Sequence, residues 1–184
     1  MLSHIPLPNR SHIAQTSGHS YSYIYYPTTS SFKPTVLLLH GFPSASHDWR
    51  FQIAHLKFLG YGVLAPNLLG YGNSSKPSDL AAYVGTVMSR DMIEILDHEG
   101  VKGKIVVVAH DWGTYILSQL IVWFPERLEK VVFLCVPFTP PGRKADIEAL
   151  NKLTKKRLGY ELYGYWMFLT RDGAGKVIGE HVSL

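Results

Sequence analysis

The chain has 184 residues and a formal net charge of +4, from 18 basic and 14 acidic side chains. This length is typical of one domain or part of one, and a composition of 46% hydrophobic and 17% charged residues excludes a disordered chain. A single cysteine, Cys135, excludes an internal disulfide, and no Cys/His spacing typical of zinc sites is present. We therefore expect no metal, a reducing, cytoplasmic setting, and Cys135 as an inert thiol buried in an apolar strand.

The positive charge is concentrated in one segment. Residues 143–157 contain six basic and two acidic side chains, a surplus of four that equals the whole net charge. One solvated helix face explains this surplus, so we expect no nucleic-acid partner. The first twelve residues have no apolar run behind their charge, and no later stretch is apolar enough to span a bilayer. We therefore expect neither a signal peptide nor a membrane partner.

Apolar runs alternate with helix-like stretches along most of the chain. Alternating polarity over 11–16 and 20–26 predicts an antiparallel hairpin. Buried-type strands are predicted at 35–40, 62–66, 104–110 and 130–136, and helices at 45–59, 80–98 and 112–124. This order predicts an α/β fold, a mostly parallel sheet with flanking helices. Residues just after the strands are the first site candidates, because parallel sheets place their sites at the carboxyl ends of strands.

The pattern changes near Pro140. The segment VPFTPPGRK breaks regular structure, and residues 145–157 and 159–170 then predict two amphipathic helices that contain several Tyr and Trp. We expect a core over 1–140 and a second part over 141–184 that is too short to form a core of its own.

The segment Ala109-His110-Asp111-Trp112-Gly113 lies between a predicted strand and a predicted helix. Its form, small-x-nucleophile-x-small, is that of a strand-to-helix elbow that presents a nucleophile. Small residues are needed there because the strand and the helix cross closely. Asp111 is also a good helix N-cap, so this motif alone leaves a structural role open. We expect His110 to pack behind the elbow and not to transfer protons.

The segment His40-Gly41-Phe42-Pro43 follows an earlier strand, where α/β hydrolases place the loop that completes an oxyanion hole. Such a hole needs two backbone N–H groups aimed at one oxygen, one from this loop and one from the residue after the nucleophile. Phe42 and Trp112 are therefore the candidate donors. A simple turn after the strand is the alternative for this segment.

A third segment, PNLLGYGNSSKP at residues 66–77, follows the strand GVLAP. Its Gly70-x-Gly72 lacks the remaining features of a dinucleotide or phosphate loop, so we expect no cofactor. The three motifs in this order resemble the epoxide hydrolase branch of the α/β-hydrolase family, over nearly the whole chain. The family pattern has Asp at the position of Asn67. This departure puts any charge interaction there in doubt.

The resemblance implies an enzyme that hydrolyses a small-molecule epoxide to a vicinal diol. Asp111 would attack the epoxide and form an ester, and the Phe42 and Trp112 N–H groups would stabilise the oxyanion formed when water splits that ester. Tyr160 matches the cap tyrosine of the family in the stretch GYELYGYW, and would protonate the epoxide oxygen. Packing within an aromatic-rich helix is the alternative for Tyr160.

The late acid and histidine of the family have no counterpart in this sequence, so we expect a truncated α/β-hydrolase fold with a partial helical cap. The ester is then expected to persist, and residues 130–136 to form an exposed apolar edge that favours self-association. Two alternatives stay open. One is a haloalkane or haloacetate dehalogenase that uses Asp111, with Trp112 as a halide donor, and the other is a catalytically dead fragment.

Overall fold

A computed structural model describes residues 9–14, 16–142 and 145–181, and the chain divides into two compact units after Pro141. The expectation about a signal peptide rests on the first twelve residues, of which the first eight lie outside this description, as do Arg143 and Lys144 of the basic segment. Within the described ranges, no helix is both long and apolar enough to cross a membrane.

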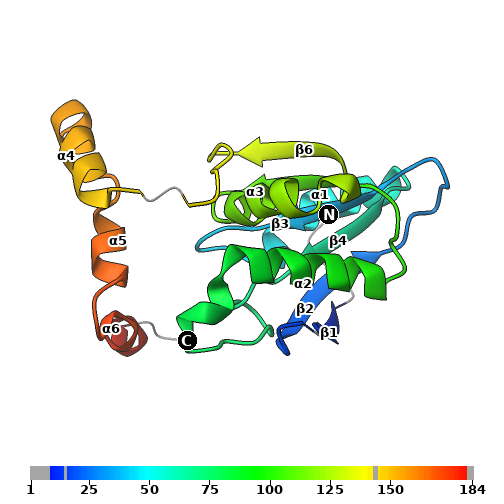
Figure 1. The fold of residues 1–184 in the computed structure, drawn as a ribbon, viewed down its shortest axis with the longest axis horizontal. Helices are drawn as coiled ribbons and strands as arrows, with labels where there is room; N and C mark the ends of the chain where they lie inside the picture. Colours follow the sequence, from blue (N-terminus) through cyan, green and yellow to red (C-terminus); the bar gives the residue numbers. More distant parts are fainter. Residues whose placement is uncertain (1–8, 15, 143–144, 182–184) are drawn as a thin grey trace. The chain divides into compact units, whose positions relative to one another are not determined.

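The first unit is built on a six-stranded sheet in the order β1-β2-β4-β3-β5-β6 (Figure 1). The hairpin β1-β2 and the pair β2-β4 are antiparallel, and the pairs β4-β3, β3-β5 and β5-β6 are parallel. This confirms the predicted α/β fold with a mostly parallel sheet. The strands are β1 (Asn9–Ile13), β2 (Ser20–Tyr26), β3 (Thr35–Leu39), β4 (Gly62–Pro66), β5 (Ile105–His110) and β6 (Leu128–Leu134).

Two strands differ in position from the predictions. β1 ends at Ile13, three residues before the predicted end, because a tight turn follows in which the Gly18 N–H donates to the Ala14 carbonyl at 2.8 Å. β6 ends at Leu134 because Cys135 adopts a left-handed conformation, with φ +71°. Cys135 is therefore outside the strand and exposed, so the expectation of a buried thiol was wrong.

Three helices of the first unit flank the sheet: α1 (Arg50–Phe58), α2 (Gly85–His98) and α3 (Gly113–Trp123). A 3-10 turn precedes each of the first two, η1 (Ser46–Trp49) before α1 and η2 (Leu80–Tyr83) before α2. The predicted helices over 45–59 and 80–98 are thus each divided. In the second case Val84 interrupts the helix, because its ψ of 127° is extended.

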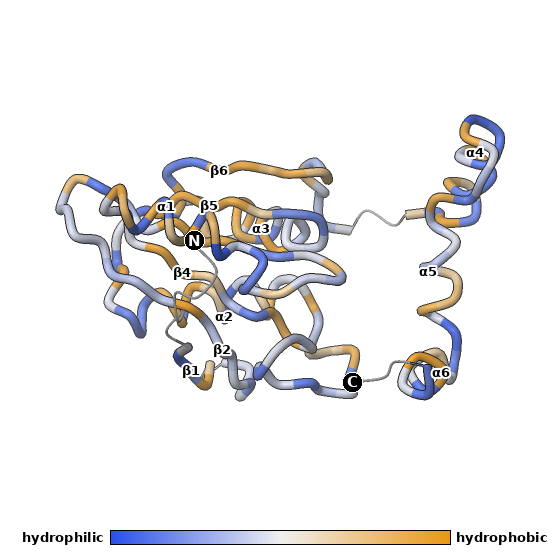
Figure 2. The backbone as a smooth tube through the Cα atoms, turned by 180° about the vertical axis from the view of Figure 1, so that it is seen from behind, coloured by the Kyte–Doolittle hydropathy of each residue, from blue (hydrophilic) through white to orange (hydrophobic). Residues whose placement is uncertain are grey.

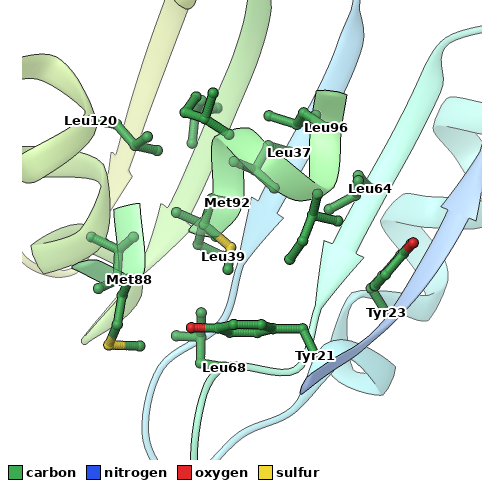
Figure 3. Close-up of a cluster of buried hydrophobic side chains, with 14 of the residues drawn as sticks. Tyr21, Tyr23, Leu37, Leu39, Leu64, Leu68, Met88, Met92, Leu96 and Leu120 are labelled. Carbon is green, nitrogen blue, oxygen red and sulfur yellow. The ribbon is translucent and has the colours of Figure 1, made fainter. Parts of the chain in front are cut away.

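Two apolar clusters cover the two faces of the sheet. Side chains alternate along a strand, so Leu37 and Leu39 of β3 face one cluster and Val36 and Leu38 face the other. The larger cluster contains buried side chains of α2 and α3 together with Leu37, Leu39 and Tyr21 (Figure 3). The smaller cluster contains side chains of η1 and α1. β3 is therefore buried on both faces, which fixes the position of the loop that follows it.

The second unit contains α4 (Ile147–Leu158), α5 (Gly164–Leu169) and α6 (Ala174–His181). The Asp146 side chain caps α4 by accepting the Ala149 N–H at 2.9 Å, and Gly159, with φ +85°, ends it. The helix predicted over 159–170 therefore begins only at Gly164, and Tyr160 lies in the connection before it. The sequence pattern did not predict α6.

Candidate active site

Asp111 lies at the turn between β5 and α3, and its backbone is held from both sides. Its φ of +50° is in the left-handed region, which is uncommon outside glycine. The Asp111 N–H donates to the Leu134 carbonyl at 3.2 Å, and its carbonyl accepts the Thr114 hydroxyl at 2.6 Å and the Thr114 N–H at 3.0 Å. The neighbouring strand and the first turn of α3 together stabilise this strained conformation.

The strand, the helix and the preceding loop approach one another very closely at the elbow. A Cβ atom added to Gly113 would lie 2.5 Å from the Leu39 carbonyl oxygen, and one added to Gly41 would lie 2.5 Å from the Asp111 side chain. Neither position has room for a side chain. These distances are the physical reason for small residues at both positions of the two motifs.

The Asp111 carboxylate is held by the loop after β3. β3 and β5 are adjacent parallel strands with Leu39 opposite Ala109, so the segments that follow them emerge side by side. The Phe42 N–H donates to Asp111 Oδ1 at 2.9 Å. The cap residue of α3 is Trp112, with no side-chain cap hydrogen bond. The carboxylate is therefore directed by a backbone N–H of a distant segment, as an oxyanion-hole loop would direct it.

The other members of the predicted site are placed as follows. A cis peptide bond joins Phe42 to Pro43. His110 is half-buried at the last position of β5, opposite Leu134 of β6. Tyr160 belongs to the second unit, and its assignment to the site stays a prediction.

Asn67, which replaces the Asp of the family pattern, is an uncharged link between three segments. Its Oδ1 accepts the Ser46 N–H and its Nδ2 donates to Ser22 Oγ, each at 2.9 Å. The Ser74 hydroxyl donates to the Asn67 carbonyl at 2.6 Å. Asn67 is buried, with 8% of its surface exposed, so its amide satisfies the hydrogen bonds without placing a charge in the interior.

Sequence reasoning missed the residues that hold the elbow and its loop from behind. Thr114 was detectable, because a hydroxyl three residues after Asp111 can reach back to that carbonyl. His40 was recognised only as part of a motif, yet it is buried and hydrogen-bonded to two segments. Among the described residues, no group of three or more His, Cys, Asp or Glu side chains is arranged to hold a metal ion.

Known proteins share this architecture. The model of the family described as alpha/beta hydrolase fold matches residues 34–158. An epoxide hydrolase of Neurospora crassa is 35% identical over 140 residues, which are 74% of this chain and 41% of the relative. Epoxide hydrolase A of Mycobacterium tuberculosis is 35% identical over 130 residues, which are 71% of this chain and 40% of the relative.

Solved structures of epoxide hydrolases are also similar to this chain. The crystal structure of epoxide hydrolase VrEH1 from Vigna radiata is 30% identical, with a TM-score of 0.75 over 95% of this chain and 51% of that one. Epoxide hydrolase A from Mycobacterium thermoresistibile is 32% identical, with a TM-score of 0.69 over 80% and 45%. The chain spans about two fifths of the length of the relatives from Neurospora and M. tuberculosis. The chain therefore belongs to the α/β-hydrolase family of hydrolytic enzymes, in its epoxide hydrolase branch.

Proposed function

We propose that this chain provides the nucleophile and the oxyanion hole of an epoxide hydrolase that converts a small-molecule epoxide to a vicinal diol. The observation that carries the proposal is the 2.9 Å hydrogen bond from the Phe42 N–H to Asp111 Oδ1. It holds one carboxylate oxygen, so that the other, Oδ2, is left to attack. The names of the relatives support an epoxide as the substrate class.

In the first step, Asp111 Oδ2 attacks an epoxide carbon. A carbon–oxygen bond of the ring breaks as the ester bond forms, and the epoxide oxygen takes a proton to become a hydroxyl group. We assign this proton to Tyr160, whose phenol is a suitable general acid for an alkoxide. In this proposal, residues 141–184 form the start of a helical cap, and 1–140 form the hydrolase core.

In the second step, water attacks the carbonyl carbon of the ester. The negative charge then develops on Asp111 Oδ1, the same oxygen that the Phe42 N–H already contacts. The Trp112 N–H is the second donor in this proposal. Collapse of the tetrahedral intermediate releases the diol and restores the carboxylate, and the water must lose a proton on the way. We expect no described residue to accept this proton, so attack by water should be slow and the ester should accumulate.

The test is intact-protein mass spectrometry after incubation with styrene oxide. The parent chain should gain one epoxide mass per protein, and peptide mapping should locate the adduct at Asp111. The Asp111→Ala variant should gain none, and Asp111→Asn, which keeps an acceptor for the Phe42 N–H, should gain none while keeping the fold. Asp172→Ala, a change at an exposed carboxylate of the second unit, should react like the parent.

Other results would redirect the assignment. An adduct with a 1-chloroalkane but not with styrene oxide would favour a dehalogenase, since the same carboxylate would then displace chloride. Folded protein that gains no mass with either reagent would refute covalent chemistry at Asp111 and leave a non-catalytic role. Equal labelling of the parent and Asp111→Ala would mean that the epoxide reacts with other nucleophiles.

A further inference from the structure

His40 is a buried imidazole that bridges the two loops behind Asp111. It is 1% exposed, its Nε2 lies 2.9 Å from the Leu68 amide nitrogen, and its Nδ1 lies 2.9 Å from the Gly41 carbonyl oxygen. The Leu68 N–H can only donate, so Nε2 must be the unprotonated acceptor. Nδ1 then carries the hydrogen and donates it to the Gly41 carbonyl. The ring is therefore neutral, and both of its nitrogen atoms are engaged.

The Gly41 carbonyl and the Phe42 N–H belong to one peptide group, which connects His40 to the active site. A trans peptide is rigid and planar, with its C=O and N–H pointing in opposite directions. His40 holds the oxygen of this plane at 2.9 Å, and Asp111 Oδ1 accepts from the nitrogen on the other side, also at 2.9 Å. Any rotation of the plane that breaks the first bond therefore misdirects the second.

The surroundings of the ring favour its neutral form. Burial lowers the pKa of His40, and the Gly41 carbonyl and the charge of Asp48 on η1 offset this only in part. The Asp48 carboxylate is itself held by the Ser44 hydroxyl at 2.8 Å and the Ala45 N–H at 3.0 Å. On the other side, the Tyr71 ring meets the imidazole edge to face, with 4.8 Å between ring centroids.

We propose that His40 is a positioning residue that orients the Phe42 N–H through the 41–42 peptide plane, and that protonation of His40 releases this plane. A proton on Nε2 would face the Leu68 N–H, so two donors would oppose each other and the ring would have to move. This inference rests on the proposed function, in which the Phe42 N–H aims the carboxylate. Adduct formation should therefore decline in mild acid.

The test compares His40→Asn with His40→Leu, two side chains of similar size. The amide of Asn can still donate to the Gly41 carbonyl, whereas Leu cannot, and neither titrates. We expect His40→Asn to form the Asp111 adduct at close to the parent rate at pH 7.5, and His40→Leu to be at least about tenfold slower, because the Phe42 N–H then no longer aims the carboxylate. His55→Asn, an exposed change on α1, should match the parent.

The pH dependence separates positioning from simple packing. The rate of adduct formation by the parent should fall as the pH drops below about 6.5, the ordinary pKa of histidine. The midpoint of this fall should lie below 6.5, because burial lowers the pKa of His40. His40→Asn should lack this decline, and any acid loss with another cause would remain in both proteins. Equal acid profiles for the two would overturn the proposal.

Amide hydrogen exchange at Phe42 and Leu68 gives a readout that does not depend on adduct formation at Asp111. Protection of both amides in the parent should fall about tenfold relative to His40→Asn between pH 7.5 and pH 5, equivalent to about 1.4 kcal/mol. If no protein forms an adduct, the proposed function fails while exchange still tests His40. Unchanged Phe42 protection in folded His40→Leu would overturn the proposal; if that variant does not fold, the comparison with His40→Asn decides.

Discussion

The close crossing at the elbow makes Gly113→Ala a decisive substitution, because two opposing effects can be compared in size. Alanine is the better helix former, by about 1 kcal/mol inside a helix. Its methyl group, however, would lie 2.5 Å from the Leu39 carbonyl oxygen and 2.7 Å from that of His40. Both oxygens are backbone atoms at the end of β3, whose ladders to β4 and β5 hold it in place.

Since these atoms cannot turn away as a side chain would, the cost should reach the upper end of the overpacking range, about 3 kcal/mol. The net loss is then about 2 kcal/mol, which at a slope of about 2 kcal/mol per molar shifts the urea midpoint down by about 1 M. Circular dichroism in urea measures the shift. Gly103→Ala is the control, because a Cβ there would meet nothing within 4 Å. A Gly113→Ala midpoint equal to that of the control would refute the reasoning.

Three further substitutions follow from buried groups and from the sheet edge. Asp91, fully buried, accepts the Tyr21 hydroxyl at 2.8 Å, and burial raises its pKa. The protonated carboxyl stabilises the fold fully below pH 3.8, and this contribution is lost as the pH rises through the raised value, so Asp91→Asn should be more stable relative to the parent at pH 7 than at pH 4. Asn67→Ala leaves the buried Ser46 N–H without its acceptor and should cost about 2 kcal/mol, and Asn67→Asp should cost less. Val132, 41% exposed on the edge strand β6, should promote self-association that Val132→Lys reduces.

Urea midpoints at pH 4 and pH 7 test the first two substitutions, and sedimentation velocity over a concentration series tests the third. If the urea midpoints of Asp91→Asn and the parent differ by the same amount at both pH values, the raised pKa of Asp91 is not the cause of the difference. An Asn67→Ala variant as stable as the parent would mean that another acceptor replaces the side chain. A parent chain that is monomeric at every concentration would contradict the predicted self-association. Figure 2 shows that β6 is hydrophobic beyond its first residues.

The parts of the fold and the site that rest on local patterns were predictable. Apolar runs identify β3, β4 and β5, of which β3 and β4 are buried on both faces, and the bounds of β2 and β4 agree with the prediction. The elbow was detectable because strand, Asp111 and helix are contiguous. The pairing of this elbow with the loop at Phe42 was expected from the place of that loop in α/β hydrolases. The adjacency of the parallel strands β3 and β5 is the physical reason for it.

The remaining features depend on contacts between distant residues or on a single dihedral angle. Asn67 bonds to Ser22 and Ser46, which are 45 and 21 residues away, and no periodicity encodes such partners. The same holds for the bond from the Leu68 N–H to His40, 28 residues earlier. The end of β6 was misplaced because Cys135 continues the apolar pattern, while its backbone turns into the left-handed region.

The donor that contacts Asp111 is a backbone N–H. A substitution at position 42 can therefore change which substrates fit without changing the hydrogen bond that the reaction uses. Every residue except proline carries that N–H, so the side chain at position 42 is free to differ among descendants of one ancestor without loss of the hydrogen bond. The Phe42 side chain is 40% exposed and takes no part in that hydrogen bond. Changes of substrate shape can therefore accumulate at this position while the reaction itself is inherited intact.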